Sequence, residues 1–499
     1  MHNTTSGKKL VLNSIIYSFS GMLLKCFSFF LLPLYTVFLT TEDYGITSVA
    51  ASVTGTMTFV VSLSLYSAIM RFYVDLKDNE VKLKRFYGTV TVFTFLSGVV
   101  WFVILTLFRD FLSDRIFSGV DFYPVIVVCL LGLIFTCQTT IYDDILKSQQ
   151  KAMKSSSLSI AQFFAHLGLN ILFIVILKLG ALGSLLAVLI SQLIFTIYFW
   201  VDMIIHKQII FCLDFNLLKA ALKYSIPIIP HNLSTQLALF FSKVLIGGTA
   251  SLASVGIYSV ASQFGDIADT FQGYIDKAYG PWLFEKLKAH DENFKRTIRN
   301  NVRMLIAVLG LLFIAIALFA QDYILLLVNR AYIDAWKYIP LIVLVFSIKT
   351  AYYFYVEVLF YHKKASRLIF IATLSSSLVN ILLSYYFIPS LGIQGSILAD
   401  ALAMILRVAI VIFFSRQFEN VGLNISDFVI NFFIIALFIG IGMLPSVVKQ
   451  IERFSLPNLM FKVCVVTVYI VIIGLKYRTQ LKPLLARISN RICRGGRKR

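Results

Sequence analysis

Charged side chains interrupt several long apolar stretches of this sequence, and these side chains have the strongest potential for chemistry. The basic ones are Lys25, Lys243, Lys349, Arg407 and Lys462, with Arg71 at the end of another apolar stretch. The acidic ones are Asp266, Asp269, Glu357 and Asp400. A charge at the centre of a membrane span costs roughly 2.5–3.5 kcal/mol on insertion scales, so each of these residues needs an explanation.

The lysines differ in their depth within the apolar stretches. Lys25 and Lys349 lie near the centres of their stretches, too deep to reach the membrane surface easily. Each either faces a polar cavity or pairs with a neighbouring carboxylate. Lys243 lies near the end of its stretch, where a lysine can extend to the interface, and Lys462 has a similarly ordinary explanation.

Arg407 and Asp400 are seven residues apart, so they lie on one face of a helix, two turns from each other. We expect this face to point inward. Together with Lys25, Lys243 and Lys349, the arginine would make a cationic cavity suited to phosphate-type anions. Arg71 would attract such an anion at the inner mouth, although contact with lipid phosphates also explains it.

The acidic residues allow two explanations. Asp266 and Asp269 are three residues apart on one helix face, so they either bind a coupling cation or balance Lys25 or Lys349. Glu357 precedes a basic loop, as Asp144 does earlier in the chain, which favours a structural salt bridge there.

Composition identifies the class of protein. The chain has 499 residues, of which 59% are hydrophobic and 14% charged, and its mean hydropathy is +0.83. This predicts an all-α polytopic membrane protein. We expect about fourteen spans of roughly twenty residues each. They are 11–34, 45–67, 88–108, 122–142, 156–177, 181–203, 224–246, 253–275, 301–320, 338–360, 368–388, 392–415, 428–448 and 459–475. Pro33, Pro227, Pro230, Pro281 and Pro389 mark span ends or breaks.

An internal repeat relates the two halves of the sequence. LGALGSLLA at 179–187 resembles LGIQGSILA at 391–399, and YGITSVAAS at 44–52 resembles VGIYSVASQ at 255–263. YDDILKSQQKA at 142–152 likewise resembles YVEVLFYHKKA at 355–365. Because six spans separate equivalent positions, both bundles should have the same orientation, related by a pseudo-two-fold axis along the membrane normal.

The repeat and the apolar stretches divide the chain into four parts. We predict an N-terminal bundle at 1–205, a second bundle at 206–425, two further helices at 426–475 and a basic tail at 476–499. Most of the 45 Lys and Arg residues fall in loops on one side, which puts both termini in the cytoplasm. The tail should contact anionic lipid, and we expect no nucleic-acid partner.

No pattern of a catalytic or metal site is present. The sequence lacks a P-loop, a nucleophile elbow and metal-like spacing of His, Cys or Glu. We therefore expect neither an enzyme nor a cofactor, and transport driven by an ion gradient or by downhill flow.

Several motifs resemble polysaccharide flippases of the multidrug/oligosaccharidyl-lipid/polysaccharide (MOP) exporter superfamily. They are PLYTVFLTTEDYG at 33–45, LYSAIMRFY at 65–73, YSIPIIPHNLS at 224–234 and ASVGIYSVASQFGD at 253–266. The resemblance implies two six-helix bundles with alternating access. Lys25 resembles in placement a basic residue of the related peptidoglycan-precursor flippase. Where the family often has an Asp-Arg pair, this chain has Ser242 and Lys243, which puts cation coupling there in doubt.

The resemblance also implies a substrate and a location. It implies that undecaprenyl-pyrophosphate-linked O-antigen or capsule repeat units move from the inner to the outer leaflet of a bacterial inner membrane. Membrane lipids and polysaccharide polymerase or assembly proteins would be partners. A drug/cation antiporter of the same fold and, less favoured, a membrane-embedded glycan polymerase or ligase are the alternative functions.

Overall fold

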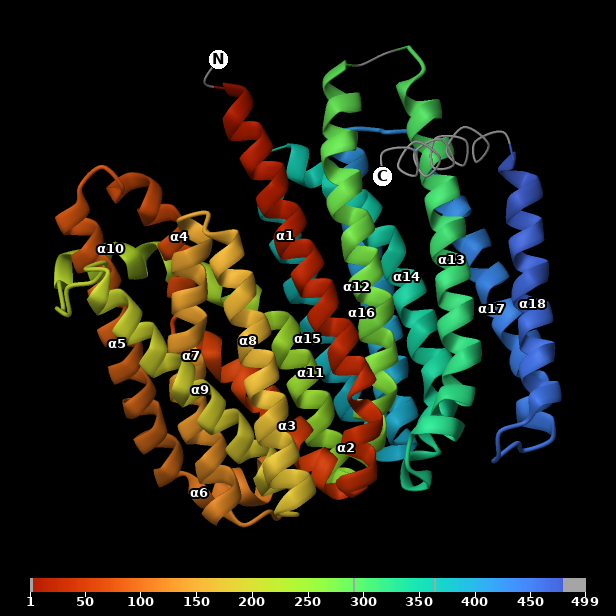
Figure 1. Cartoon of the computed structure of the whole chain (residues 1–499). Coiled ribbons are helices and arrows are strands. Elements are labelled where there is room, and N and C mark those ends of the chain that lie inside the picture. The colour runs from red at the N-terminus through yellow and green to blue at the C-terminus, as the bar shows by residue number, and fades with distance from the viewer. Residues whose placement is uncertain (1–2, 290–291, 363–364, 479–499) are drawn as a thin grey trace, which may run out of the picture. The chain divides into compact units, whose positions relative to one another are not determined.

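The protein is built of helices, as the composition predicts. A computed structural model describes residues 3–289, 292–362 and 365–478, and within these ranges it contains helices and no strands (Figure 1). The helices of the first half are α1 (Asn3–Phe30), α2 (Leu32–Phe38), α3 (Thr41–Val61), α4 (Leu65–Leu76), α5 (Glu80–Leu107), α6 (Arg109–Phe111), α7 (Val127–Ser148), α8 (Ala152–Asn170) and α9 (Gly180–Ile205). The second half contains α10 (Phe215–Ser225), α11 (Ile229–Thr249), α12 (Leu252–Ala289), α13 (Phe294–Leu327), α14 (Ala335–Tyr361), α15 (Ser366–Leu391), α16 (Ile393–Phe418), α17 (Ile425–Val448) and α18 (Leu456–Lys476).

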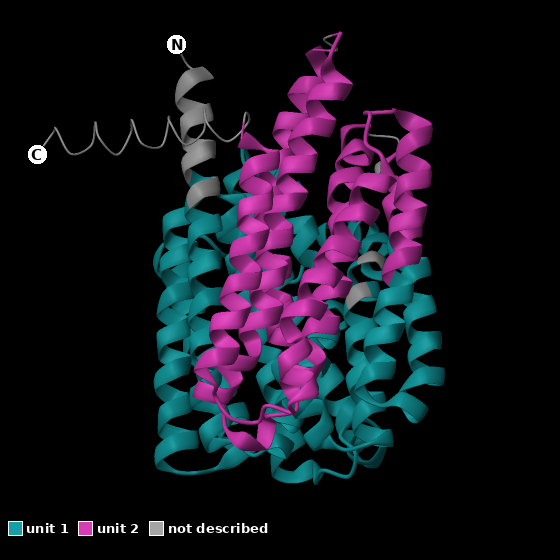
Figure 2. Cartoon of the chain, turned by 90° about the vertical axis from the view of Figure 1, so that its right-hand side faces the viewer, with its two compact units in different colours: residues 1–260, 373–403 teal, residues 261–372, 404–499 magenta. Residues whose placement is uncertain are grey.

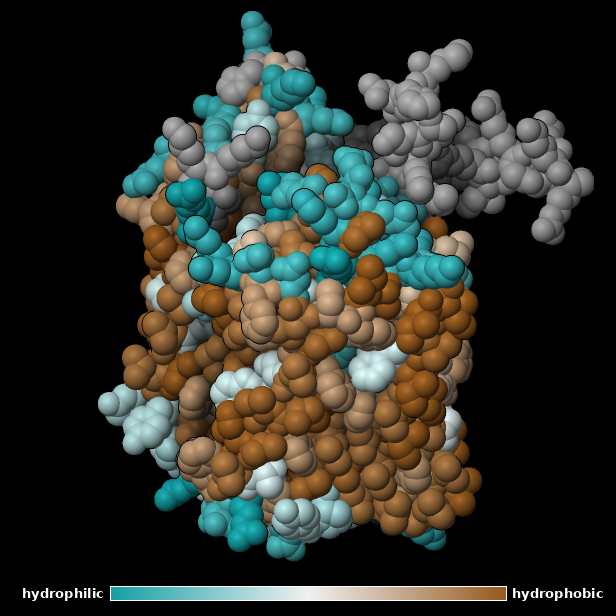
Figure 3. Space-filling view, turned by 90° about the vertical axis from the view of Figure 1, so that its left-hand side faces the viewer, coloured by the Kyte–Doolittle hydropathy of each residue, from teal (hydrophilic) through white to brown (hydrophobic). Residues whose placement is uncertain are grey.

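Twelve helical stretches of the described residues are long and apolar enough to cross a membrane. Helices α11 and α12 occupy the positions of the seventh and eighth predicted spans and have sufficient length, but they are less apolar. One face of the molecule shows a broad hydrophobic band with hydrophilic residues above and below it (Figure 3). The chain is therefore a multi-pass membrane protein whose backbone polar groups are satisfied within helices.

Two of the predicted breaks lie where the sequence places them. The first span divides at Leu31, between α1 and α2, directly before the helical turn that contains Pro33. Ile226–Ile228 forms a single 3-10 turn between α10 and α11, which confirms the irregular turn expected around Pro227.

Other boundaries differ from the predictions. The second span ends at Val61, because Leu63 and Ser64 adopt left-handed backbone conformations, and the chain then starts the separate helix α4. Pro281 lies inside α12, which continues past the predicted end at 275. Pro389 likewise lies inside α15. Residues 479–499 of the predicted basic tail lie outside the described residues.

The repeated sequences have repeated geometry. Gly180 and Gly392 precede equivalent helices and have φ values of +56° and +57°, a conformation that glycine adopts without steric cost. Gly45 and Gly256, equivalent in another repeated segment, make reciprocal close contacts. A Cβ on Gly45 would overlap the carbonyl oxygen of Leu252, and a Cβ on Gly256 would overlap that of Thr41. The repeat therefore brings two helix starts together around a local two-fold relation.

The chain forms two compact units whose boundaries differ from those of the repeat (Figure 2). Unit 1 comprises residues 1–260 and 373–403, and within it α7 packs against α3, α4, α5, α8 and α9. Unit 2 comprises 261–372 and 404–499, and within it α13 packs against α14, α17 and α18. The four-part division derived from the repeat remains a prediction.

Candidate functional site

Lys25 is an exposed lysine in the middle of the first span. Two contacts fix α1 against α8: the hydroxyls of Ser20 and Ser156 are 2.9 Å apart, and the rings of Phe27 and Phe163 stack with centroids 5.6 Å apart. Lys25 projects from nearly the opposite side of α1. Within the described part of the chain it forms no ion pair, and this distinguishes it from the other deep lysines.

Lys243 lies beside the local two-fold contact of unit 1. Its ammonium is 3.5 Å from the carbonyl oxygen of Ser48 and has further interactions. The Ser48 hydroxyl is itself 2.5 Å from the hydroxyl of Ser259, its equivalent in the repeat. A cation thus lies at the point where the starts of α3 and α12 meet.

Asp400 accepts hydrogen bonds from two neutral groups of unit 1 and has further interactions. The Asn380 amide donates to it at 2.7 Å, and the Tyr258 hydroxyl donates at 3.5 Å. Arg407 follows on the same continuous helix, α16, and in unit 2 its charge lies close to the Tyr352 hydroxyl. The spacing of Asp400 and Arg407 by two helical turns is therefore preserved.

Lys349 is neutralised by Asp269 in unit 2. The Lys349 ammonium is 2.6 Å from a carboxylate oxygen of Asp269, which also accepts a hydrogen bond from the Tyr353 hydroxyl at 3.0 Å. Of the two explanations for Asp269, the geometry thus shows charge balance for Lys349. Asp266 is exposed on the same helix and has interactions of its own.

Glu357 faces another carboxyl group. Its carboxylate lies against Gly280 of α12, one turn from the carboxyl group of Asp276, and neither acidic residue forms an ion pair within the described residues. The salt bridge expected for Glu357 is therefore replaced by a carboxyl pair. The sequence reasoning missed Asp276 because the predicted span ended at 275, although the apolar and polar residues continue with a helical period beyond it.

Arg71 lies on α4, outside the predicted second span. Its guanidinium is 3.5 Å from the carboxylate of Asp75, and both side chains are about half exposed. An exposed ion pair of this kind contributes little to stability, and the role of Arg71 at the inner mouth stays a prediction.

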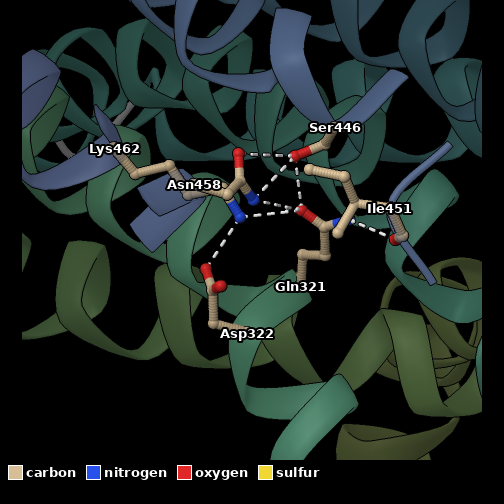
Figure 4. A network of polar contacts seen from close by, with 6 residues as sticks. All are labelled: Gln321, Asp322, Ser446, Ile451, Asn458 and Lys462. Atoms are coloured by element: carbon tan, nitrogen blue, oxygen red, sulfur yellow. Dashed lines mark hydrogen bonds and ion pairs between the residues drawn. The ribbon is translucent and has the colours of Figure 1, made fainter. Parts of the chain in front are cut away.

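A buried polar network joins α13, α17 and α18 (Figure 4). The Lys462 ammonium donates to Gln321 Oε1 and to Asp322 Oδ2, both at 2.7 Å. Ser446 Oγ donates to the same Gln321 oxygen at 2.6 Å, and the Asn458 amide donates to Ser446 at 3.1 Å. Lys462 is fully buried and does not reach the membrane surface. Its role is structural, as a salt bridge between helices of the bundle. Within the described residues no three His, Cys, Asp or Glu side chains are grouped as a metal site.

Comparison with known structures shows the class of fold. The chain is similar to the lipid II flippase MurJ in an inward closed conformation, with a TM-score of 0.67 and 16% identity over 94% of this chain and all of that one. It is also similar to an inward-facing multidrug-resistance transporter of the MOP superfamily, with a TM-score of 0.53 and 16% identity over 79% of this chain and 94% of the other. The protein therefore has the fold of the MOP transporters.

The sequence comparisons identify the family. Residues 10–287, more than half of the chain, match the family described as polysaccharide biosynthesis protein. The chain therefore belongs to this family, as its motifs predicted, and its fold is the one shared by the MOP-superfamily structures named above. It is also 23% identical, over 74% of its length and 88% of the relative's, to an uncharacterized membrane protein of Haemophilus influenzae.

Proposed function

We propose that this protein moves oligosaccharides linked to a polyprenyl pyrophosphate, of the O-antigen or capsule repeat-unit type, from the inner to the outer leaflet of a bacterial inner membrane. Its family is one of polysaccharide biosynthesis, and its fold is shared with a lipid II flippase. Alternating access between the two six-helix bundles would carry the glycan while the polyprenyl chain stays in lipid.

The observation that carries this proposal is Lys25. An ammonium at the centre of a span is costly unless it has a counter-ion, and the described residues supply none. A pyrophosphate can fill this role through charge-assisted hydrogen bonds. Lys349 contributes less to anion binding than the sequence suggested, because Asp269 already neutralises it. Arg407 and Lys243 remain proposed contacts of the head group, and Arg71 of the inner mouth.

Substitution of Lys25 tests this role. We expect Lys25→Gln to reduce surface glycan at least tenfold and Lys25→Arg to restore most of it, because the arginine retains the positive charge. The assay is immunoblotting of surface polysaccharide in cells that lack the native protein, with membrane levels of each variant measured in parallel. Lys337→Gln serves as the control, since Lys337 forms an exposed ion pair with Asp334 at 2.6 Å. Normal surface glycan with Lys25→Gln would contradict the proposal.

A further inference from the structure

The Asp276–Glu357 pair lies on the contact between α12 and α14 in unit 2. Gly280, one turn after Asp276, provides the surface on which Glu357 rests, because a Cβ on Gly280 would lie 2.6 Å from Glu357 Oε2. At the same contact, the ring of Tyr279 meets the ring of Phe354 edge-on, with centroids 4.8 Å apart. The two carboxyl groups are therefore held together by the packing of two long helices.

Among the described residues of this contact, three acidic side chains are Asp269, Asp276 and Glu357, and Asp269 is the one that forms an ion pair. Asp269 has the Lys349 ammonium at 2.6 Å. The carboxyl groups of Asp276 and Glu357 are neighbours. The nearby Lys277 ammonium forms no ion pair with them and lies over the ring of Tyr274, 5.3 Å from its centroid. Two neighbouring carboxylates repel each other strongly when both are ionised, so a proton on one of them would stabilise the pair.

The internal repeat provides a natural comparison. Asp144 occupies in the first half the position that Glu357 occupies in the second, and Lys147 follows it one turn later at 3.7 Å. Phe360 replaces this lysine in the second half. The second half therefore has no cation at this position, and a second carboxyl group, Asp276, lies on the facing helix.

Unpartnered polar groups lie beside the pair. Asp276 and Gln272 line the same small cavity, which has no room for a water-sized sphere. Gln272 is 1% exposed; its amide nitrogen donates to Thr350 Oγ1 at 2.6 Å and to the Phe346 carbonyl at 2.9 Å, while its Oε1 has no partner. The Tyr279 hydroxyl, on a side chain that is 3% exposed, is also without a partner. A buried acceptor and a buried hydroxyl without partners are expensive unless a proton or a rearranged donor reaches them in part of the cycle.

We propose that Asp276 and Glu357 form a proton-binding site that couples the packing of α12 on α14 to protonation. With one proton the pair shares a hydrogen bond and the helices pack as they do here. Loss of that proton to water leaves two carboxylates that repel each other, so the packed arrangement is favoured at low pH and weakened as the pH rises. The role of this site in driving the transport cycle rests on the function proposed above, whereas proton binding itself does not.

Other titratable or charged groups lie close to the pair. They are Lys277 and Tyr279 on α12, Tyr352 and Tyr353 on α14, and Arg407 on α16, which lies close to Tyr352. Arginine stays charged and buried tyrosine stays neutral across the range from pH 5 to 8.5, so neither changes its charge there. Lys277 is exposed and directed to Tyr274.

A pH titration of the purified full-length protein tests the site without transport. Trp282 provides the signal, because its ring centroid is 5.9 Å from that of Tyr279. We expect one fluorescence transition between pH 5 and 8.5 that disappears in Glu357→Gln and in Asp276→Asn, and that is assigned to this tryptophan by its loss in Trp282→Phe. A transition that persists in both carboxyl variants, or none in the native protein, would overturn the proposal.

Phe360 offers a variant that keeps both carboxyl groups. Phe360→Lys restores the lysine that the first half has, so the transition should move to lower pH by about one unit or more. Phe360→Met is the matched control and should leave the midpoint unchanged. An unchanged midpoint in Phe360→Lys would contradict the proposed electrostatics.

A comparison of sodium with potassium chloride tests whether the ion bound by the pair is a proton. The midpoint should be the same in sodium and in potassium chloride at equal ionic strength, since the cavity is small and the pair already contains its proton. A midpoint that shifts with sodium alone would overturn the assignment to the proton. Because these measurements need no glycan substrate, their failure leaves the proposed transport function standing, and a failure of glycan transport leaves the titration interpretable.

Discussion

Loss of Lys462 should destabilise the contact of α17 and α18 with α13. The substitution Lys462→Met keeps the length of the side chain and removes its charge. Asp322, which is 5% exposed, would then be a buried carboxylate without a cation, and Gln321 Oε1 would lose one donor (Figure 4). Breaking a buried ion pair from one side costs about 3–5 kcal/mol. The insertion cost of a lone carboxylate in a span, about 2.5–3.5 kcal/mol, gives a similar magnitude.

The measurement is unfolding of the purified protein by SDS, followed by its tyrosine and tryptophan fluorescence. Asp322→Asn alone should also be destabilised, because it leaves a buried lysine without a counter-ion. The double variant Lys462→Met/Asp322→Asn should regain most of the loss, which gives a coupling energy of about 2 kcal/mol or more.

An exposed ion pair of the same geometry provides the control. Lys337 and Asp334 are 2.6 Å apart, but their side chains are 58% and 52% exposed. Lys337→Met should therefore cost less than about 1 kcal/mol. If Lys462→Met costs no more than Lys337→Met, or if the double variant is no better than the single ones, burial does not determine the strength of this pair and the reasoning is refuted.

Two further predictions concern the contact between the starts of α3 and α12. Cysteines at positions 48 and 259 should form a disulfide, because the two serine hydroxyls are 2.5 Å apart, and oxidation should stop glycan export until a reductant is added; export that continues in fully cross-linked protein would show that this contact does not open. Gly256→Ala should lower the stability of the protein, because its Cβ would overlap the Thr41 carbonyl, whereas Gly273→Ala on the same helix has open space and should be neutral or stabilising by about 1 kcal/mol. Equal melting temperatures for the two glycine variants would contradict this difference.

The helices could be predicted because lipid imposes helical structure on every apolar stretch of sufficient length. Ends of helices were predicted less well, since proline inside α12 does not break it and the left-handed backbone at Ser64 has no strong sequence signal. Helices α11 and α12 lie at the positions of two predicted spans although they are less apolar than the other twelve.

The charged residues could be found in the sequence, but their partners could not. Lys349 and Asp269 are far apart in the chain, and only the packing of α12 on α14 shows that they neutralise each other. Asp322 and Lys462 are separated by 140 residues, so their pairing too could not be predicted from the sequence. Asp276 was missed because it lies one residue beyond the predicted end of its span at 275, whereas α12 continues to Ala289.

The most direct test of the central claim is the leaflet location of the polyprenyl-linked glycan in cells depleted of this protein. A membrane-impermeant reagent that oxidises sugars labels the outer-leaflet pool in intact cells, and permeabilised cells give the total. We predict that depletion leaves the labelled pool close to zero while the total rises, and that the native protein restores labelling. Glycan that reaches the outer leaflet at a normal level during depletion would contradict the proposed transport function.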